Sequence, residues 1–380
     1  MASVSDVKTS YNLENAHQTM KQVKDKKRDK CLKIGLTFGI LIGLVVFAIV
    51  LAVLITVMAQ NNFNSVPNNN NNNGDCTTSE VVQPRVTAHD VNTIKADITE
   101  HIREKRQGGS LIRIAGFVRL AFHDCVGGCD GCIDLGNGEN AGLGLYIEEL
   151  DPVYSKYSNK LSRADFWQLA GIAALQESGR GCNNCIHPWV QFVAGRKDCS
   201  SSPKYDGPHR MFPNNGGHAN IDDVLGFFNS TFGLSRSQPE LAVALLGAHS
   251  LGRTHRGASG WDGPWDLTPD RLDQSYYSDM MRLNWTEVEI SNNKHQWKPP
   301  IGNTMMLHAD MCLHKVISPI NTTTGQSACP FAQLCDNQPE TSKFVQLFAD
   351  DLEAWERNFQ AAYYKMITTG YTNAELYVPA

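Results

Sequence analysis

Two polar side chains, Arg119 and His123, stand four residues apart in a segment whose apolar residues repeat at helical spacing. On a helix this spacing places both heads on one stripe, one above the other. Histidine is a base near neutral pH and arginine is a permanent cation. We therefore expect the pair to project together into whatever space the helix faces. A second helix is predicted over 237–252, beginning with capping-box residues and carrying His249 in its last turn.

The elements that must position these residues are predicted to be helical. Past residue 76 the apolar residues follow a 3.6-residue period, without the sustained alternation typical of strands. Further helices are predicted over 161–178 and 342–368. Short polar stretches rich in Pro and Gly over 254–340 predict long loops around brief helices. The fold class expected is all-α.

The segments Arg119-Leu-Ala-Phe-His123-Asp and Leu246-Gly-Ala-His249-Ser-Leu-Gly-Arg253 together resemble the distal and proximal motifs of the plant, fungal and bacterial haem peroxidase superfamily. The resemblance implies two subdomains that enclose haem b, with His249 as the iron ligand. His123 would then take a proton from peroxide, and Arg119 would stabilise the departing oxygen. Asn140 matches the family's asparagine that holds the distal histidine's other ring nitrogen.

On the proximal side the chain resembles the ascorbate and cytochrome c peroxidase branch. Asp310 matches the carboxylate that accepts the ring NH of the ligand histidine, which gives that histidine imidazolate character. Trp265 matches the neighbouring indole, which either shares the oxidising equivalent or is simply a packed aromatic. Two positions depart from this branch. Phe122 stands where the branch usually carries Trp and secreted peroxidases carry Phe, and Ala258 stands where ascorbate enzymes use an arginine.

The activity that the resemblance implies is reduction of hydrogen peroxide to water, with small phenolic or similar donors oxidised one electron at a time. The alternatives are a peroxidase of the ascorbate or cytochrome c type and a non-catalytic haem-binding ectodomain. A net charge of −5, without a Lys/Arg cluster beyond the first 33 residues, argues against a nucleic-acid partner.

The same comparison suggests two Ca²⁺ sites built from hard oxygen ligands. A proximal set resembles the calcium loop of secreted fungal peroxidases, with a monovalent ion as the main rival; it comprises Ser250, Asp266, Thr268, Arg271 and Asp273. A distal set comprises Asp124, Gly128 and Asp130, but Cys132 replaces the serine expected there.

Ten of the eleven cysteines follow an apolar segment, and an even number is what a disulfide framework requires. Zinc is the alternative, because Cys129 and Cys132, like Cys182 and Cys185, are spaced as zinc ligands can be. Cys125 and Cys129 match cysteines that pair in plant secreted peroxidases.

The sequence predicts four segments, which are a cytosolic tail (1–33), a transmembrane signal anchor (34–59), an Asn-rich linker (60–75) and a peroxidase domain (76–380). The anchor exceeds the ~20 apolar residues that span a bilayer. Lysines and an arginine before it predict a type II orientation, with the domain extracellular or lumenal. There, sequons beginning at Asn229, Asn284 and Asn321 could carry glycans.

Overall fold

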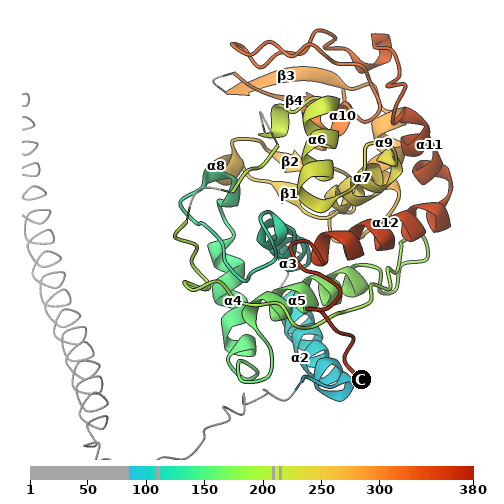
Figure 1. Cartoon of the computed structure of the whole chain (residues 1–380). Coiled ribbons are helices and arrows are strands. Elements are labelled where there is room, and N and C mark those ends of the chain that lie inside the picture. The colour runs from blue at the N-terminus through green and yellow to red at the C-terminus, as the bar shows by residue number, and fades with distance from the viewer. Residues whose placement is uncertain (1–84, 108–111, 208–209, 214–215, 292) are drawn as a thin grey trace, which may run out of the picture. The chain divides into compact units, whose positions relative to one another are not determined.

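The computed structural model describes residues 85–380, except 108–111, 208–209, 214–215 and 292 (Figure 1). The expected tail, anchor and linker lie outside the described residues. Within the described ranges, no helix is both long enough and apolar enough to cross a membrane.

The first group of helices surrounds α3 (Ile112–Cys125), which carries Arg119 and His123. It packs against α5 (Arg163–Ser178), whose side chains are almost all buried. The helix predicted over 161–178 is confirmed, and Ser162 caps it by accepting a 3.0 Å hydrogen bond from the Asp165 amide. The other helices of this group are α2 (Ala88–Gln107), α4 (Gly144–Tyr154) and the short turn η1 (Gly138–Asn140).

The second group is built around α7 (Pro239–Leu246), which packs against α12 (Leu352–Ile367). The predicted capping box is wrong, because Gln238 is the N-cap and no side chain caps the helix. The α-helix also ends before His249, which lies in the 3₁₀ turn η3 (Gly247–Ser250). A Cβ at Gly247 would collide with the Tyr277 hydroxyl and the Trp355 ring, so only glycine permits this close packing.

The helix predicted over 342–368 is two helices, α11 (Ser342–Asp350) and α12. Asp351 separates them, and its carboxylate accepts a 2.8 Å hydrogen bond from the Ala354 amide, which caps α12. Helix α11 packs against α9 (Ser275–Arg282), and α6 (Ile221–Phe232) contacts α7.

The prediction of loops and brief helices over 254–340 misses two antiparallel hairpins. The longer one pairs β3 (Thr286–Ser291) with β4 (Lys294–Lys298) and lies at the end of the domain away from α2 (Figure 1). The shorter one pairs β1 (Arg253–Thr254) with β2 (Gly263–Pro264). Besides α9, the brief helical segments in this range are α8 (Arg256–Ser259), α10 (His308–Met311) and η4 (Ala332–Leu334); the turn η2 (Gly216–His218) lies before it. The domain is mainly helical, as expected.

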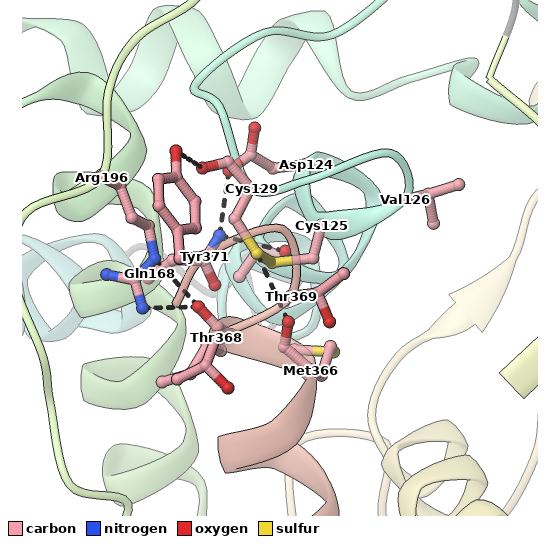
Figure 2. Close-up of a disulfide and its surroundings, with 12 residues drawn as sticks. Asp124, Cys125, Val126, Cys129, Gln168, Arg196, Met366, Thr368, Thr369 and Tyr371 are labelled. Atoms are coloured by element: carbon pink, nitrogen blue, oxygen red, sulfur yellow. Dashed lines mark hydrogen bonds between the residues drawn. A yellow bond between two sulfur atoms is a disulfide. The ribbon is translucent and has the colours of Figure 1, made fainter. Parts of the chain in front are cut away.

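Eight cysteines form four disulfides, which are Cys125–Cys129, Cys132–Cys199, Cys182–Cys185 and Cys329–Cys335. The zinc alternative is therefore wrong for both closely spaced pairs. Among the described residues, Cys312 is a buried free thiol; Cys76 lies outside the described residues. Figure 2 shows the Cys125–Cys129 bridge beside the chain that follows α12, where the Tyr371 hydroxyl donates to the Cys129 carbonyl at 3.2 Å.

Candidate active site

His123 on α3 is held by Asn140 on η1. Its Nδ1 lies 2.8 Å from Asn140 Oδ1, while Asn140 Nδ2 donates to the Asp134 carbonyl at 2.8 Å. The second bond fixes the amide orientation, so Oδ1 must accept and Nδ1 must carry the proton. Burial lowers the pKa of His123 well below its usual range, and the charge of Arg119 adds to this. The imidazole is therefore neutral, with Nε2 free to accept a proton.

Arg119 stands beside this base on the same stripe of α3, as the sequence predicts. Its guanidinium donates to the Glu139 carbonyl at 2.7 Å and to the Ala141 carbonyl at 3.0 Å. Both acceptors flank Asn140, so one short segment orients both distal residues. Phe122 packs against the phenyl ring of Phe232, with ring centroids 5.5 Å apart.

Sequence reasoning missed Phe212, whose ring centroid lies 4.8 Å from that of His123. It belongs to a loop far from α3 in sequence, so no spacing pattern marks it. The contact places an apolar wall against the distal imidazole.

His249 in η3 is bound by the buried carboxylate of Asp310, as expected. Its Nδ1 lies 2.7 Å from Asp310 Oδ1, and Asp310 Oδ2 accepts from Trp265 Nε1 at 2.8 Å. The indole stacks on the imidazole with ring centroids 4.2 Å apart. Burial alone would raise the pKa of Asp310, but the attraction of His249 and the bonds that this carboxylate accepts lower it instead. Nδ1 is thus committed to Asp310, which leaves Nε2 available to a metal.

Tyr276 on α9 is a further proximal residue that sequence reasoning missed. Its buried hydroxyl donates at 2.8 Å to Asp310 Oδ1, the oxygen that also accepts from His249. A second donor on this oxygen withdraws electron density and weakens its hold on the imidazole proton. Tyr276 therefore limits the imidazolate character of His249.

We predict that Tyr276→Phe lowers the ferric/ferrous reduction potential of the haem-loaded protein. The expected change is about 30 to 60 mV, roughly a three- to tenfold change in a one-electron equilibrium constant. Tyr277→Phe is the matched control, because that hydroxyl donates to the Val243 and Ala244 carbonyls instead. Equal potentials in wild type and Tyr276→Phe would show that the hydroxyl does not tune His249.

The residues of the expected proximal calcium set are brought together. Ser250 Oγ donates to Asp266 at 2.8 Å, and Thr268 Oγ1 donates to Asp273 at 2.7 Å. The Arg271 carbonyl also accepts from Ser250 Oγ at 2.9 Å. Burial, together with the nearby Asp273, raises the pKa of Asp266 to about 7 against the opposing Ser250 bond. In the described part of the chain, no Lys or Arg side chain forms an ion pair with either carboxylate.

The expected distal calcium set begins at Asp124, near the end of α3, and continues into the loop that follows this helix. Asp124 is fully buried, and its carboxylate accepts hydrogen bonds from the Cys132 amide at 3.2 Å and from Gln168 Nε2 at 3.0 Å. Asp130 forms a 2.5 Å ion pair with Arg210, which sequence reasoning did not include. Gly128 takes a positive φ of 133° in this loop.

The described residues fit the haem that the resemblance implies. The His249 side chain remains 32% exposed although its partner Asp310 is fully buried, so the nitrogen opposite Asp310 is open to a ligand. The segment that carries His249 also lies close to the one that carries His123. A Cβ at Gly252 would lie 2.6 Å from the Cβ of Ala115 on α3, and α8 packs against η1.

Comparison with known proteins agrees with this geometry. The family model described as peroxidase matches residues 94–351. The chain is 26% identical to a mitochondrial cytochrome c peroxidase of Pyricularia oryzae, over 75% of this chain and 72% of that protein. It is 28% identical to L-ascorbate peroxidase 3 of Arabidopsis thaliana, over 67% of this chain and 73% of that protein. These findings show that the chain belongs to the haem peroxidase superfamily and is an oxidoreductase acting on peroxide.

Proposed function

We propose that this peroxidase reduces hydrogen peroxide to water with electrons from small phenolic or similar donors, taken one at a time. The observation that carries the proposal is the His123 imidazole, which Asn140 orients, beside the guanidinium of Arg119. Bound haem would supply the iron that takes up peroxide oxygen and holds the oxidising equivalents until donors return electrons.

In this proposal, Nε2 of His123 removes one peroxide proton and later delivers it to the departing oxygen. Arg119 stabilises the negative charge that develops on that oxygen. On the other side, Asp310 draws the Nδ1 proton of His249 toward itself. This would make Nε2 of His249 a stronger ligand for the haem iron.

The choice of donor rests on the residues near α8. Ala258 is exposed there and offers no charge to an anionic donor. Arg256, two residues earlier, donates to the Ile290 carbonyl at 3.4 Å, so this guanidinium is directed to the hairpin. Because the uncharged Ala258 stands where ascorbate enzymes use an arginine, we favour neutral phenols over ascorbate as donors.

Steady-state assays of the haem-loaded protein with a phenol, ascorbate and ferrocytochrome c test this assignment. We expect kcat/KM to be highest with the phenol, and we expect Ala258→Arg to raise only the ascorbate value. The relatives named above are cytochrome c and ascorbate peroxidases. A wild-type preference for either of their donors would overturn the phenolic assignment and leave the peroxidase assignment intact.

We further propose that the proximal set holds one Ca²⁺. The set offers two carboxylates that have no ion pair with a described Lys or Arg, together with two hydroxyls and a carbonyl, and all of these are suitable hard ligands. Stripping calcium with a chelator should lower the free energy of unfolding by about 3 kcal/mol relative to calcium at 100 times its dissociation constant. Calorimetry with and without calcium measures this difference, and Asp266→Asn should abolish it. Stabilisation by K⁺ but not by Ca²⁺ would assign the site to a monovalent ion.

The proposed location is the extracellular or lumenal side of a membrane, with residues 34–59 as the anchor. Four disulfides are typical of proteins in oxidising compartments. The three sequon asparagines, 229, 284 and 321, are all exposed. Glycosidase treatment of the full chain made in eukaryotic cells should increase its electrophoretic mobility. If glycosidase treatment leaves the mobility of the chain with all three sequons unchanged, this placement is contradicted.

A further inference from the structure

The loop after α3 holds a basic side chain where the resemblance places a cation. The side chain of Arg210 is only 8% exposed. One of its nitrogens forms the 2.5 Å ion pair with Asp130, and the other donates to the carbonyls of Asp124 at 3.2 Å and Val126 at 3.4 Å. One guanidinium thus binds a carboxylate and two carbonyls, the oxygen types that a calcium ion would take.

The surroundings of Arg210 hold the guanidinium in this position. Its Cζ lies 4.2 Å from the ring centroid of Tyr205, within cation–π distance. A Cβ at Gly127 would lie 2.9 Å from Arg210 Cδ, so the arginine stem passes directly over a loop position without a side chain. The loop after α3 therefore leaves room for the Arg210 side chain at Gly127.

Two other positions of the expected distal calcium site, Asp124 and Cys132, already have other bonding partners. Gln168 and the Cys132 amide already bind the carboxylate of Asp124, and Figure 2 shows Gln168 directed at it. Cys132 is bridged to Cys199 and offers no hydroxyl. The distal residues do not fit a calcium ion while Arg210 is present.

The proximal and distal sets differ in what balances the charge of their carboxylates. Asp266 and Asp273 have no ion pair with Lys or Arg among the described residues, so no basic side chain described there supplies their countercharge. In the distal loop, a side chain of the same protein supplies it. The two acidic sets of this chain are thus balanced in different ways.

Arg210 is also connected to the distal histidine by two routes. The carbonyls that it binds belong to the end of α3 and the residues just after it, next to His123. Two residues along its own loop, Phe212 packs against the His123 ring. Both contacts place Arg210 where it can fix the position of the base.

We propose that the guanidinium of Arg210 takes the place of a distal cation and positions His123 for reaction with peroxide. Arg210 is a positioning residue, since it acts on His123 through the backbone of α3 and through Phe212. Arg210→Gln removes the charge and opens a set of oxygens around Asp130. That variant should then gain a calcium site that the wild-type protein lacks.

The test compares haem-loaded wild type, Arg210→Gln, Arg210→Lys, Asp130→Asn and the double variant Arg210→Gln/Asp130→Asn. Two quantities are measured: the rate constant for reaction with hydrogen peroxide, and the number of calcium ions bound per haem. The proximal set contributes equally to every variant, so differences in the calcium count report on the distal loop. Arg236→Gln is the matched control, an arginine with two ion pairs and a side chain 46% exposed.

We expect Arg210→Gln to react about tenfold more slowly in the presence of a chelator, the usual effect of removing a partner that orients a functional group. Calcium should restore part of the rate and add one bound ion, and the double variant should show neither effect. Arg210→Lys keeps the buried charge, so it should react at an intermediate rate without binding the extra ion, even if Arg210→Gln fails to fold.

Two results would overturn the proposal. One is a calcium count that falls in Asp130→Asn while Arg210 is intact, because the wild-type loop would then hold an ion. The other is a wild-type rate in Arg210→Gln. A loss of rate caused only by damage to the fold would not be reversed by calcium.

Discussion

The His123→Leu variant should bind haem normally but react with hydrogen peroxide roughly 10²- to 10⁴-fold more slowly than wild type, the range for loss of a general base. The reason is that peroxide must lose one proton before its oxygen–oxygen bond breaks. His123 is the neutral base whose tautomer Asn140 fixes. Stopped-flow absorbance at the haem band gives the rate constant directly.

His89→Leu is the control for this variant, because His89 is an exposed histidine on α2. It should react at the wild-type rate. If His123→Leu retains the wild-type rate constant while its haem spectrum is unchanged, the proton is removed by another group and the distal assignment is wrong.

Arg119→Leu should slow the same reaction by roughly 10²- to 10³-fold, the usual effect of losing a preorganised donor that stabilises developing negative charge. The guanidinium is partly buried, so water screens its charge less than it would screen a charge on the open surface. The variant also loses the two bonds to the Glu139 and Ala141 carbonyls, so the position of Asn140 must be checked. Steady-state KM for the reducing donor should change little, because Arg119 acts on peroxide.

The Arg119→Lys variant separates the effect of the positive charge from that of the planar guanidinium group. Lysine keeps the positive charge but cannot bind both carbonyls with a planar fork, so a partial recovery of rate is expected. Arg357→Leu, at an exposed position on α12, controls for the loss of a surface charge. An Arg119→Leu protein with an unchanged rate constant would remove arginine from the proposed chemistry.

The central residues of the site could be predicted because each stands in a short local motif. Arg119 and His123 share a helical stripe, and His249 lies at the end of an apolar helix. Their partners Asn140 and Asp310 came only from the resemblance, and both form the hydrogen bonds that it implies. Such local motifs are predictable because the geometry of a helix alone fixes how residues close in sequence lie relative to one another.

The residues that were missed act over long sequence separations. Tyr276 reaches Asp310 across 34 positions, and Arg210 reaches Asp130 across 80. No periodicity encodes such contacts. From sequence alone, a single tyrosine on a short helix or a single arginine in a loop cannot be distinguished from a solvated side chain.

Some errors in the fold had signals that could have been found. Val288 and Ile290 alternate with glutamates in β3, which is the pattern of a half-exposed strand. Other errors came from tertiary packing. Gly247 permits an approach to Tyr277 and Trp355 too close for any side chain, in the 3₁₀ turn that places His249.

The most direct test of the account is the absorption spectrum of the haem-loaded His249→Ala protein. The account predicts that the variant loses the wild-type spectrum, because it assigns the iron bond on that side to the imidazole of His249. Added imidazole should then restore the wild-type spectrum by taking the place of the missing side chain. A variant spectrum identical to that of wild type, without imidazole, would show that His249 is not the iron ligand and would contradict the site as a whole.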